Sequence, residues 1–326
     1  MSGAAADPRR GDGGLRALAP AKINLGLFVG PTREGDGRHE LVTVMQSISL
    51  ADELTLAPVA SGSGGDQLVC DGVPGPPGEN LAAAALAAFR ERTGWDGPPQ
   101  RLVIDKRIPV AAGLAGGSAD AAATLRLASR LSGLGSTEEL GEMAAELGAD
   151  VPAQLAPGRW LATGAGEFLR ELPAPRSQFG ILVLPLAAEL PTGSVYAEAD
   201  RQGVGRGRGE LREREAELAA ALEHGAELPH ASELMHNDLQ RVAVSLCPEI
   251  APVLGEVRAA GADLALVSGS GPTVLGLYVS SYERRVDGAE RARAAALALA
   301  GREGGAFAAE PVGADFGAVQ PVAAAG

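Results

Sequence analysis

The sequence predicts an α+β fold in two halves, and three observations support this prediction. The chain has 326 residues, which corresponds to two domains or one large one. Apolar residues make up 46% of the chain and charged residues 21%, a composition that allows a sizeable buried core. Strand-like and helix-like periodicities are mixed along the chain, without a regular alternation of strand and helix. We therefore expect two domains, each with both strands and helices.

The first half is expected to form a domain over residues 16–171. Residues 1–15 are rich in Gly, Ala, Asp and Arg and show no periodicity, so we expect a disordered tail there. Apolar runs predict strands over 16–30, 41–59 and 101–109, the second of which could be two strands that meet at Ala51. Ala-rich or amphipathic segments predict helices over 80–94, 118–131 and 137–148. A loop and a hairpin are expected to complete this domain.

The second half is expected to form a domain over residues 179–326, after a proline-containing linker at 172–178. It opens with an apolar strand, FGILVLPL, and closes with a short strand near 305–312. A glycine turn at 268–273 separates two further apolar runs. Charged and amphipathic patterns predict helices over 209–225, 236–246, 251–261 and 283–301.

Charge and composition exclude several classes of partner. The formal net charge is −13, which argues against nucleic acid or an anionic membrane, because both favour basic surfaces. The apolar runs are shorter than a membrane-spanning helix needs, and the first residues lack the apolar core of a secretory signal. The two cysteines, Cys70 and Cys247, form no C-x-x-C pair. We expect a cytoplasmic protein with reduced thiols, either a monomer or a homodimer.

Lysine is rare, and this makes its positions informative. The chain has 26 Arg but only 2 Lys, Lys22 and Lys106. Such a bias favours Arg wherever a generic cation suffices, so a retained lysine can indicate a site where a compact ammonium is needed. Lys22 lies in an apolar strand segment, PAKINL, two residues before Asn24, so both side chains point to the same face. An edge-strand lysine that points to water is the alternative.

The strongest local signal is the glycine-rich segment 109–120, PVAAGLAGGSAD. Glycines lie between a predicted strand and an Ala-rich helix that is expected to begin near Ser118. Free N–H groups and the positive end of the dipole at such a helix start can bind phosphate. The segment lacks the G-K-[ST] of a Walker A loop and the G-x-G-x-x-G of a dinucleotide site. A purely structural turn remains the alternative.

Two shorter segments add to this signal. Asp150 lies between a predicted helix end and Val-Pro, where we expect a restricted, extended backbone. The turn SGSGPT at 268–273 could close over a phosphate or a substrate. Taken alone, the aspartate could be a helix cap and the second segment a tight β-turn.

Together, and in this order, the segments PAKIN, PVAAGLAGGSADAA, GADVP and VSGSGPT resemble the GHMP kinases, the superfamily of galactokinase, homoserine, mevalonate and phosphomevalonate kinases. Within it, the sequence is most similar to the kinases of 4-diphosphocytidyl-2-C-methyl-D-erythritol. The segments that carry this closer similarity are PAKINLGL, DGRHEL, ENL, DKRIP, GADVP and PTGSVY. The resemblance implies an N-terminal domain like domain 2 of ribosomal protein S5, a ferredoxin-like C-terminal domain, and an active site between them.

The resemblance also implies roles for individual residues. Asp150 would act as general base and Lys22 would keep it ionised and orient the hydroxyl. Asn80, Leu81 and Lys106 would contact the adenine and ribose of ATP. Mg²⁺ would arrive with the nucleotide, with Ser118 as one candidate contact and no metal site in the protein itself. The ATP phosphates would be wrapped by the loop residues Pro109, Val110, Ala111, Ala112, Gly113, Leu114, Ala115, Gly116, Gly117, Ser118 and Ala119.

The implied acceptor is a small molecule, a cytidine diphosphate-linked sugar alcohol phosphorylated on its 2-hydroxyl. His39 matches the histidine that reads cytosine, and Tyr196 matches one of two aromatic faces. The other implied contacts are Asn24, Thr192, Gly269, Ser270 and Gly271. His224, His230 and His236 match no motif and are expected at the surface or at helix ends.

Three departures from the family pattern leave alternatives open. Arg38 replaces the aromatic residue before His39, and a guanidinium can also stack on a base. Ala112 and Ala115 stand where glycine is frequent, which is tolerable only if their φ is negative. The alternatives are a GHMP kinase for homoserine or mevalonate, and a nucleotide-binding regulator without catalysis. An NAD-dependent oxidoreductase is less favoured, because the dinucleotide fingerprint is missing.

Overall fold

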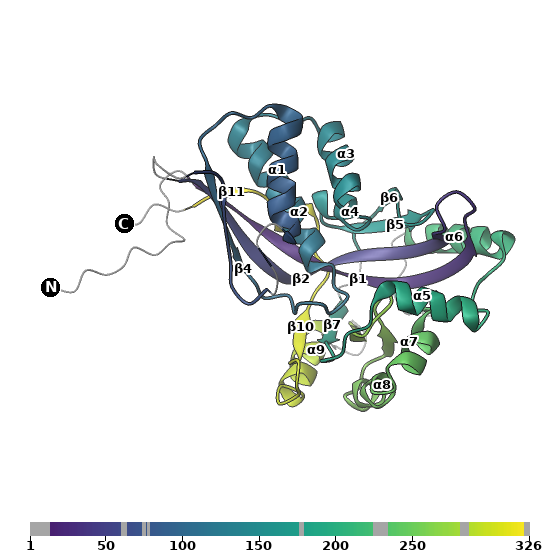
Figure 1. Cartoon of the computed structure of the whole chain (residues 1–326). Coiled ribbons are helices and arrows are strands. Elements are labelled where there is room, and N and C mark those ends of the chain that lie inside the picture. Colours follow the sequence, from purple (N-terminus) through teal and green to yellow (C-terminus); the bar gives the residue numbers. More distant parts are fainter. Residues whose placement is uncertain are drawn as a thin grey trace.

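The structure is a computed structural model that describes residues 14–59, 64–73, 76, 79–175, 179–223, 234–280 and 287–322. The expected α+β class is observed, with two sheets that each carry helices (Figure 1). Within the described part of the chain, no helix is both long enough and apolar enough to cross a bilayer. His224 and His230, expected at the surface, lie outside the described residues.

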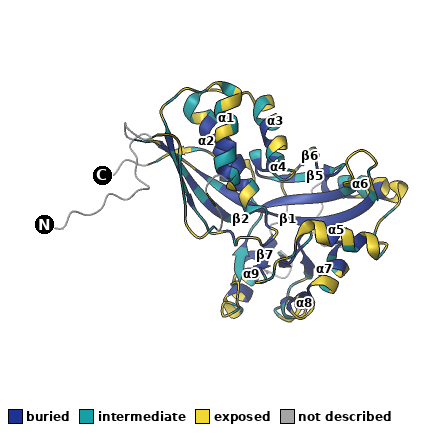
Figure 2. Ribbon diagram, in the orientation of Figure 1, coloured by how far each residue is buried: buried dark blue, intermediate teal, exposed yellow. Residues whose placement is uncertain are grey.

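The first domain is built on a long antiparallel hairpin of β1 (Leu15–Thr32) and β2 (His39–Pro58). β1 is buried from Ala19 to Gly30, because helices cover one face of the sheet and the second domain covers the other (Figure 2). This explains why β1 is mostly apolar on both faces rather than alternating, with Lys22 and Asn24 as its buried polar side chains. The strands that complete the sheet are β3 (Gln67–Cys70), β4 (Gln100–Asp105), β5 (Arg159–Thr163), β6 (Phe168–Leu172) and β11 (Gln320–Pro321).

Four helices belong to this domain, and three of them follow the predicted ranges. α1 (Leu81–Thr93) ends at Gly94, whose φ of 67° is the left-handed conformation that glycine favours at a helix stop. α2 (Gly116–Ser132) packs between α1 and the sheet, and its run of alanines allows this close approach. α3 (Thr137–Leu147) opens with a capping box between Ser136 and Glu139. The fourth, α4 (Val151–Leu155), is short.

The second domain has a four-stranded antiparallel sheet in the order β10-β7-β9-β8. α8 and α9 pack against it around a core that includes Leu182, Val257 and Tyr278. The strands are β7 (Phe179–Leu184), β8 (Leu264–Val267), β9 (Val274–Val279) and β10 (Phe307–Ala309). The helices are α5 (Thr192–Arg201), α6 (Arg208–Glu223), α7 (Gln240–Leu246), α8 (Ile250–Ala259) and α9 (Gly288–Ala298).

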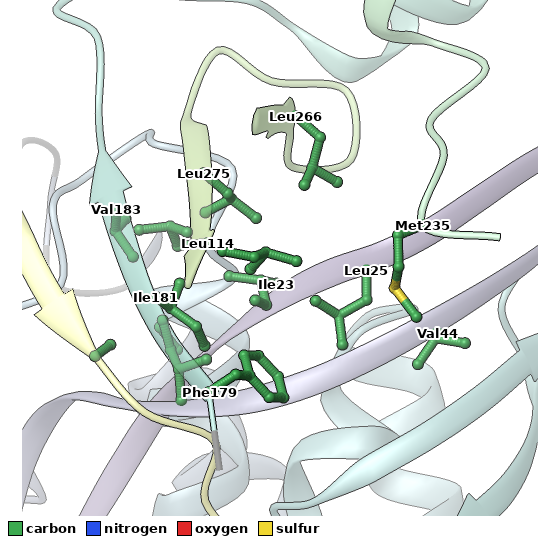
Figure 3. Packing of buried hydrophobic residues seen from close by; sticks show 14 of the residues in the cluster. Ile23, Leu25, Val44, Leu114, Phe179, Ile181, Val183, Met235, Leu266 and Leu275 are labelled. Atoms are coloured by element: carbon green, nitrogen blue, oxygen red, sulfur yellow. The ribbon is translucent and has the colours of Figure 1, made fainter. Parts of the chain in front are cut away.

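A large apolar cluster joins the two domains. Figure 3 shows Ile23 and Leu25 of β1 beside Phe179 and Ile181 of β7, with Leu114 of the glycine-rich loop among them. All five side chains are buried. The glycine-rich loop is therefore held at the domain junction by its own leucine, which places the loop beside residues of both domains.

The structure corrects several expected boundaries. Residue 15 is not part of a tail, since β1 begins at Leu15, which pairs with Leu56 and with Pro321. The second domain does not extend to the C-terminus, because β11 returns to the first sheet. β2 is one strand without a break at Ala51, and β4 ends at Asp105 rather than at Pro109. β6 ends at Leu172 and β7 begins at Phe179, on either side of the expected linker.

Candidate active site

A cavity of about 690 Å³ lies between the two domains. Residues from all four segments that carry the resemblance line it: the PAKIN segment of β1, the glycine-rich loop, the Asp150 region and the 268–273 turn. Its lining includes Lys22, Asn24, Arg38, His39, Thr43, Gly113, Ala115, Asp150, Ala165, Thr192, Tyr196, Asp200, Gly269 and Ser270. Such a concave site with a few convergent polar groups is typical of small-molecule binding.

Lys22 and Asp150 face each other in this cavity. Lys22 Nζ lies 3.6 Å from Asp150 Oδ2. Only 11% of the lysine side chain is exposed, whereas 35% of the aspartate side chain is exposed. The ammonium is thus held in place and the carboxylate is accessible to a ligand. A carboxylate in this position can accept a proton from a bound hydroxyl.

Asn24 fixes the position of the Lys22 ammonium. Lys22 Nζ donates to Asn24 Oδ1 at 2.9 Å, and Asn24 Nδ2 donates to Thr43 Oγ1 at 2.8 Å. The Thr43 hydroxyl in turn donates to the carbonyl oxygen of Gly26 at 2.6 Å. Both ends of the Asn24 amide are therefore used within the protein. The side chain was predicted to contact the acceptor, and the structure gives it a second task, which is to orient Lys22.

The backbone at Asp150 differs from the expected extended segment. Asp150 has φ −88° and ψ −14° and stands at the start of α4, where its side chain makes no capping hydrogen bond. The prediction was wrong because the proline that restricts its neighbour, Pro152, lies in the first turn of α4, a position that proline tolerates. The carboxylate is left free of the helix and points to the cavity that it lines.

The glycine-rich loop takes an unusual backbone path. Ala111 and Ala115 have positive φ values of 58° and 54°, whereas the expectation was that a methyl group at 115 requires negative φ. Left-handed conformations cost roughly 1–2 kcal/mol for a residue with a Cβ. At Gly113 a Cβ would lie 2.5 Å from the carbonyl oxygen of Gly271, so glycine is required where the two glycine-rich segments meet.

The start of α2 presents backbone N–H groups beside the cavity. The helix begins at Gly116, two residues before the predicted start at Ser118, so Gly116, Gly117, Ser118 and Ala119 belong to its first turn rather than to the loop. Ala115, at the N-cap, offers no side-chain acceptor to the free N–H groups of that turn, and it borders the cavity. This geometry fits the phosphates of a nucleotide.

Lys106 lies behind the loop and does not line the cavity. Its Nζ donates to Asp52 Oδ2 at 2.5 Å and to Asp120 Oδ2 at 2.8 Å, and Asp52 Oδ1 also accepts from the N–H groups of Arg107 and Ile108. The ammonium therefore ties β2, the start of the loop and α2 together. Burial alone would lower the pKa of Lys106, but the two carboxylates hold this pKa above its usual value.

Asp120 carries the excess negative charge of this cluster. Burial raises the pKa of Asp120 to about 7, since the attraction of Lys106 is countered by the nearby charge of Asp52. Among the described residues, its Oδ1 has no hydrogen-bond partner. A protonated Asp120 would be the less costly form, because it removes the uncompensated buried charge.

The predicted adenine contacts remain predictions. Asn80 is the N-cap of α1 and accepts a hydrogen bond from the N–H of Ala82 at 2.9 Å. Leu81 is the first residue of α1 and packs, partly buried, against the core. Together with Lys106 they lie outside the lining of the 690 Å³ cavity.

The cavity wall also includes His39 and Tyr196, which were predicted to contact the acceptor. The rings of His39 and Tyr196 lie 5.0 Å apart, and His39 Nε2 lies 2.8 Å from Asp200 Oδ1. Arg38 donates to the carbonyl oxygen of Ala165, in the turn between β5 and β6, at 2.7 Å. Burial, with the charge of Asp150 nearby and Arg38 opposing, raises the pKa of Tyr196 to about 12, so its hydroxyl stays protonated at neutral pH.

The turn at 268–273 closes the cavity from the second domain. Thr192 Oγ1 and Ser270 Oγ lie 3.1 Å apart, and Ser268 Oγ accepts from the N–H of Asn24 at 3.3 Å. Gly269 and Ser270 line the cavity, whereas Gly271 does not and meets Gly113 instead. The structure thus brings Thr192, Gly269 and Ser270 to the cavity wall and places Gly271 at the contact between the loops.

The sequence alone missed Thr43, Asp52, Asp120 and Asp200. A weak signal existed for Asp200, which follows Tyr196 by four residues and so shares its helix face. The other three depend on pairing between segments distant in sequence. No group of three or more His, Cys, Asp or Glu side chains that could hold a metal ion occurs in the described part of the chain.

Comparison with known proteins decides the family. The model of the GHMP kinases N terminal domain matches residues 80–158, and that of the GHMP kinases C terminal matches residues 218–306. The 4-diphosphocytidyl-2-C-methyl-D-erythritol kinase of Salinispora tropica is 40% identical over 285 residues, which cover 85% of this chain and 87% of the relative. The chain belongs to the GHMP kinase family. It is an ATP-dependent phosphotransferase that acts on a small molecule.

Further relatives of this GHMP kinase agree. The kinase of the same name from Streptomyces coelicolor is 44% identical over 260 residues, or 78% of this chain and 84% of the relative. A crystal structure of 4-(cytidine 5'-diphospho)-2C-methyl-D-erythritol kinase superposes with a TM-score of 0.71 at 37% identity, over 90% of this chain and 98% of that one. A homoserine kinase from Cytophaga hutchinsonii, at 17% identity and a TM-score of 0.67 over 99% of this chain and all of that one, shares the fold.

Proposed function

We propose that this kinase transfers the γ-phosphoryl group of ATP to the 2-hydroxyl of 4-diphosphocytidyl-2-C-methyl-D-erythritol. The observation that carries the proposal is one cavity lined by the Lys22–Asp150 pair, by the glycine-rich loop and by the His39–Tyr196 pair. A helix start suited to phosphates, a proton acceptor and a pair of rings in one cavity match a substrate that carries both a reacting hydroxyl and a base. The names of the relatives support the same acceptor.

In the proposed mechanism, Asp150 accepts the proton of the 2-hydroxyl as its oxygen attacks the γ-phosphorus, and ADP leaves. Phosphoryl transfer depends mainly on positioning and on charge stabilisation. Lys22, held by Asn24, forms an ion pair with Asp150 and orients the hydroxyl. The N–H groups at the start of α2 bind the phosphates. Mg²⁺, when bound with ATP, would neutralise phosphate charge, and the Ser118 hydroxyl at that helix start is a candidate contact.

The proposal is tested by following ADP release from Mg-ATP with three acceptors in parallel: 4-diphosphocytidyl-2-C-methyl-D-erythritol, homoserine and mevalonate. Rapid release with the cytidyl compound alone is expected. Release with homoserine or mevalonate alone would retain the kinase chemistry and overturn the acceptor. Absence of release with all three, in a protein that still binds ATP, would favour a non-catalytic nucleotide-binding role.

We expect Asp150→Asn to lower kcat by roughly 10²–10⁴-fold, because the amide cannot accept the hydroxyl proton. Binding of ATP, measured by calorimetry, should change little, since the phosphate site at α2 is untouched. Full activity of this variant would contradict the assignment of Asp150 as general base.

A further inference from the structure

Gln154 is a buried polar side chain that the proposed chemistry leaves without a role. It lies on α4, four residues after Asp150, and is only 1% exposed, away from the lining of the cavity. Its Nε2 donates to the carbonyl oxygen of Pro20 at 3.0 Å, and its Oε1 accepts from Ser47 Oγ at 3.4 Å. Both polar ends of this amide therefore contact the hairpin of β1 and β2.

The hairpin is irregular at the place that this amide contacts. The partner of Pro20 on β2 is Ala51, whereas the partner of Lys22 is Ser47, so the register shifts between Pro20 and Lys22. Irregularities of this kind re-aim a side chain and are frequent next to active sites. The N–H of Lys22 donates to the carbonyl oxygen of Leu114, in the glycine-rich loop, at 3.1 Å. The backbone at Lys22 is therefore held by contacts from outside the hairpin as well as by β2.

The element that carries Asp150 also depends on outside contacts. α4 has five residues, a little more than one helical turn, and so short a helix is not stable by itself. Val151 anchors it through the apolar core that α1 and α2 share. Gln154 anchors it through hydrogen bonds to the hairpin. The direction in which Asp150 points follows from how these two contacts hold α4.

We infer that Gln154 is a positioning residue that holds Asp150 at its distance from Lys22. This one side chain links the elements that bear the pair, because it ends on the carbonyl oxygen of Pro20, two residues before Lys22. The inference rests on the proposed role of Asp150 as general base and is independent of which acceptor the kinase uses. A displacement of about 1 Å in a reacting group can cost about 10²-fold in rate, so loss of this link should lower turnover.

Gln154→Met tests the inference, because methionine has a similar length and makes neither amide contact. We expect kcat, at saturating ATP and 4-diphosphocytidyl-2-C-methyl-D-erythritol, to fall about tenfold to a hundredfold. In the Asp150→Asn background the same substitution should cause little further loss, because the group that it positions is already missing. A merely structural role for Gln154 would lower kcat by the same factor in both backgrounds, and that result would overturn the inference.

Gln100→Met is the matched control. Gln100 is also 1% exposed, and its Nε2 also donates to a proline carbonyl oxygen, that of Pro98, at 2.7 Å. It lies at the start of β4 and does not line the cavity. Both variants should lose comparable stability in urea, whereas only Gln154→Met should lose turnover. If the two variants had equal kcat values, the loss of a buried amide would suffice as the explanation and the positioning role would be wrong.

The scarcity of lysine provides a second readout that needs no substrate. The chain has only two lysines, so protein labelled with ¹³Cε-lysine should give two signals in ¹H–¹³C spectra, and Lys22→Met assigns them. We expect Gln154→Met to shift the Lys22 signal in the direction in which Asp150→Asn shifts it, and Gln100→Met to leave that signal in place. An unmoved Lys22 signal in Gln154→Met would overturn the inference even if Asp150 is the base. Full activity of Asp150→Asn would instead overturn the proposed base, and the positioning role with it.

Discussion

The two lysines of the chain lie in regions of similar burial but of different construction. Lys22 has 11% of its side chain exposed and Lys106 has 12%. Around Lys22 the carboxylate partner is 3.6 Å away and open to the cavity, and an amide completes the contact. Around Lys106 two buried carboxylates lie within 2.8 Å. Burial of the lysine itself therefore does not distinguish the two sites. The exposure of its carboxylate partners decides whether a buried lysine can contact a ligand or only stabilises the fold.

The largest expected effect concerns the fold around Lys106. Lys106→Met leaves Asp52 and Asp120 buried without their shared cation, and removal of one partner of a buried ion pair typically costs about 3–5 kcal/mol. We expect a loss of that size in the free energy of unfolding, measured with urea. Adding Asp120→Asn to this variant should restore part of the loss, because one of the uncompensated carboxylates is then removed. If Lys106→Met were as stable as the wild type, Lys106 would not stabilise the fold, and the two lysines would not differ in this respect.

Lys22→Met should show the opposite pattern. Asp150 can be solvated in the cavity, and water can replace the lost donor to Asn24, so unfolding should change by at most about 1–2 kcal/mol. Turnover should fall by about 10²–10³-fold, because a charge aimed at the reacting groups is lost. Steady-state kinetics and urea unfolding on the same preparation test both parts. A large loss of stability with retained kcat would assign Lys22 to the fold and contradict the comparison.

A third expected effect is a pH dependence that belongs to the Lys106 region. The pKa of Asp120 in the folded protein, about 7, is above its ordinary value of 3.8, so the folded state binds the proton more tightly than the unfolded state. The contribution of Asp120 to stability is therefore full at low pH and is lost as pH rises from about 4 to about 7, at no more than about 1.4 kcal/mol per pH unit.

Asp120→Asn should flatten this slope relative to the wild type. Urea unfolding of both proteins at intervals between about pH 4 and pH 8 measures the difference in slope. Asp150→Asn, in the exposed cavity, is the control that should keep the wild-type slope. If the Asp120 variant and the wild type lost stability in parallel, the protonation of Asp120 would not be linked to folding.

The smallest expected effect lies in the loop that Lys106 supports. Ala115→Gly relieves a left-handed alanine at the start of α2, and the gain should exceed the extra entropy cost of glycine, for a net stabilisation of about 0.5–1 kcal/mol. Ala112→Gly is the matched control, because Ala112 is buried and does not have a positive φ. It should destabilise the protein by about 1 kcal/mol. A loss of stability in both variants would mean that the strain at Ala115 is not released by glycine.

Local chemistry accounts for much of what the sequence predicted. The end of α1 at Gly94 follows from a backbone conformation that glycine adopts readily, and α3 starts at a capping box that four adjacent residues supply. The order of the motifs was sufficient to predict the family and the two-domain fold. Lys22 and Asp150 were predicted together, and the structure places them 3.6 Å apart.

The predictions failed where distant segments decide the local structure. The two-residue strand β11 has no pattern of its own; near it, Arg126 donates to the carbonyl oxygens of Gly317 and Leu18, which ties this end of the chain to α2 and β1. The positive φ at Ala115 reverses the expectation for an alanine. The residue before it, Leu114, is buried in the core between the domains, and its carbonyl oxygen accepts from the N–H of Lys22. Neither feature can be deduced from neighbouring residues.

Capping, periodicity and motif order are local properties of the chain, so they were sufficient to predict most elements, the family and the residue types available for catalysis. Which charges meet depends on how the chain folds in three dimensions. The ammonium of Lys106 contacts Asp52, 54 residues away in sequence, and Asp120, 14 residues away. The ring of His39 contacts Asp200, which is 161 residues away. Such pairings depend on strand register and helix packing, which arise only when the two domains close around their shared core.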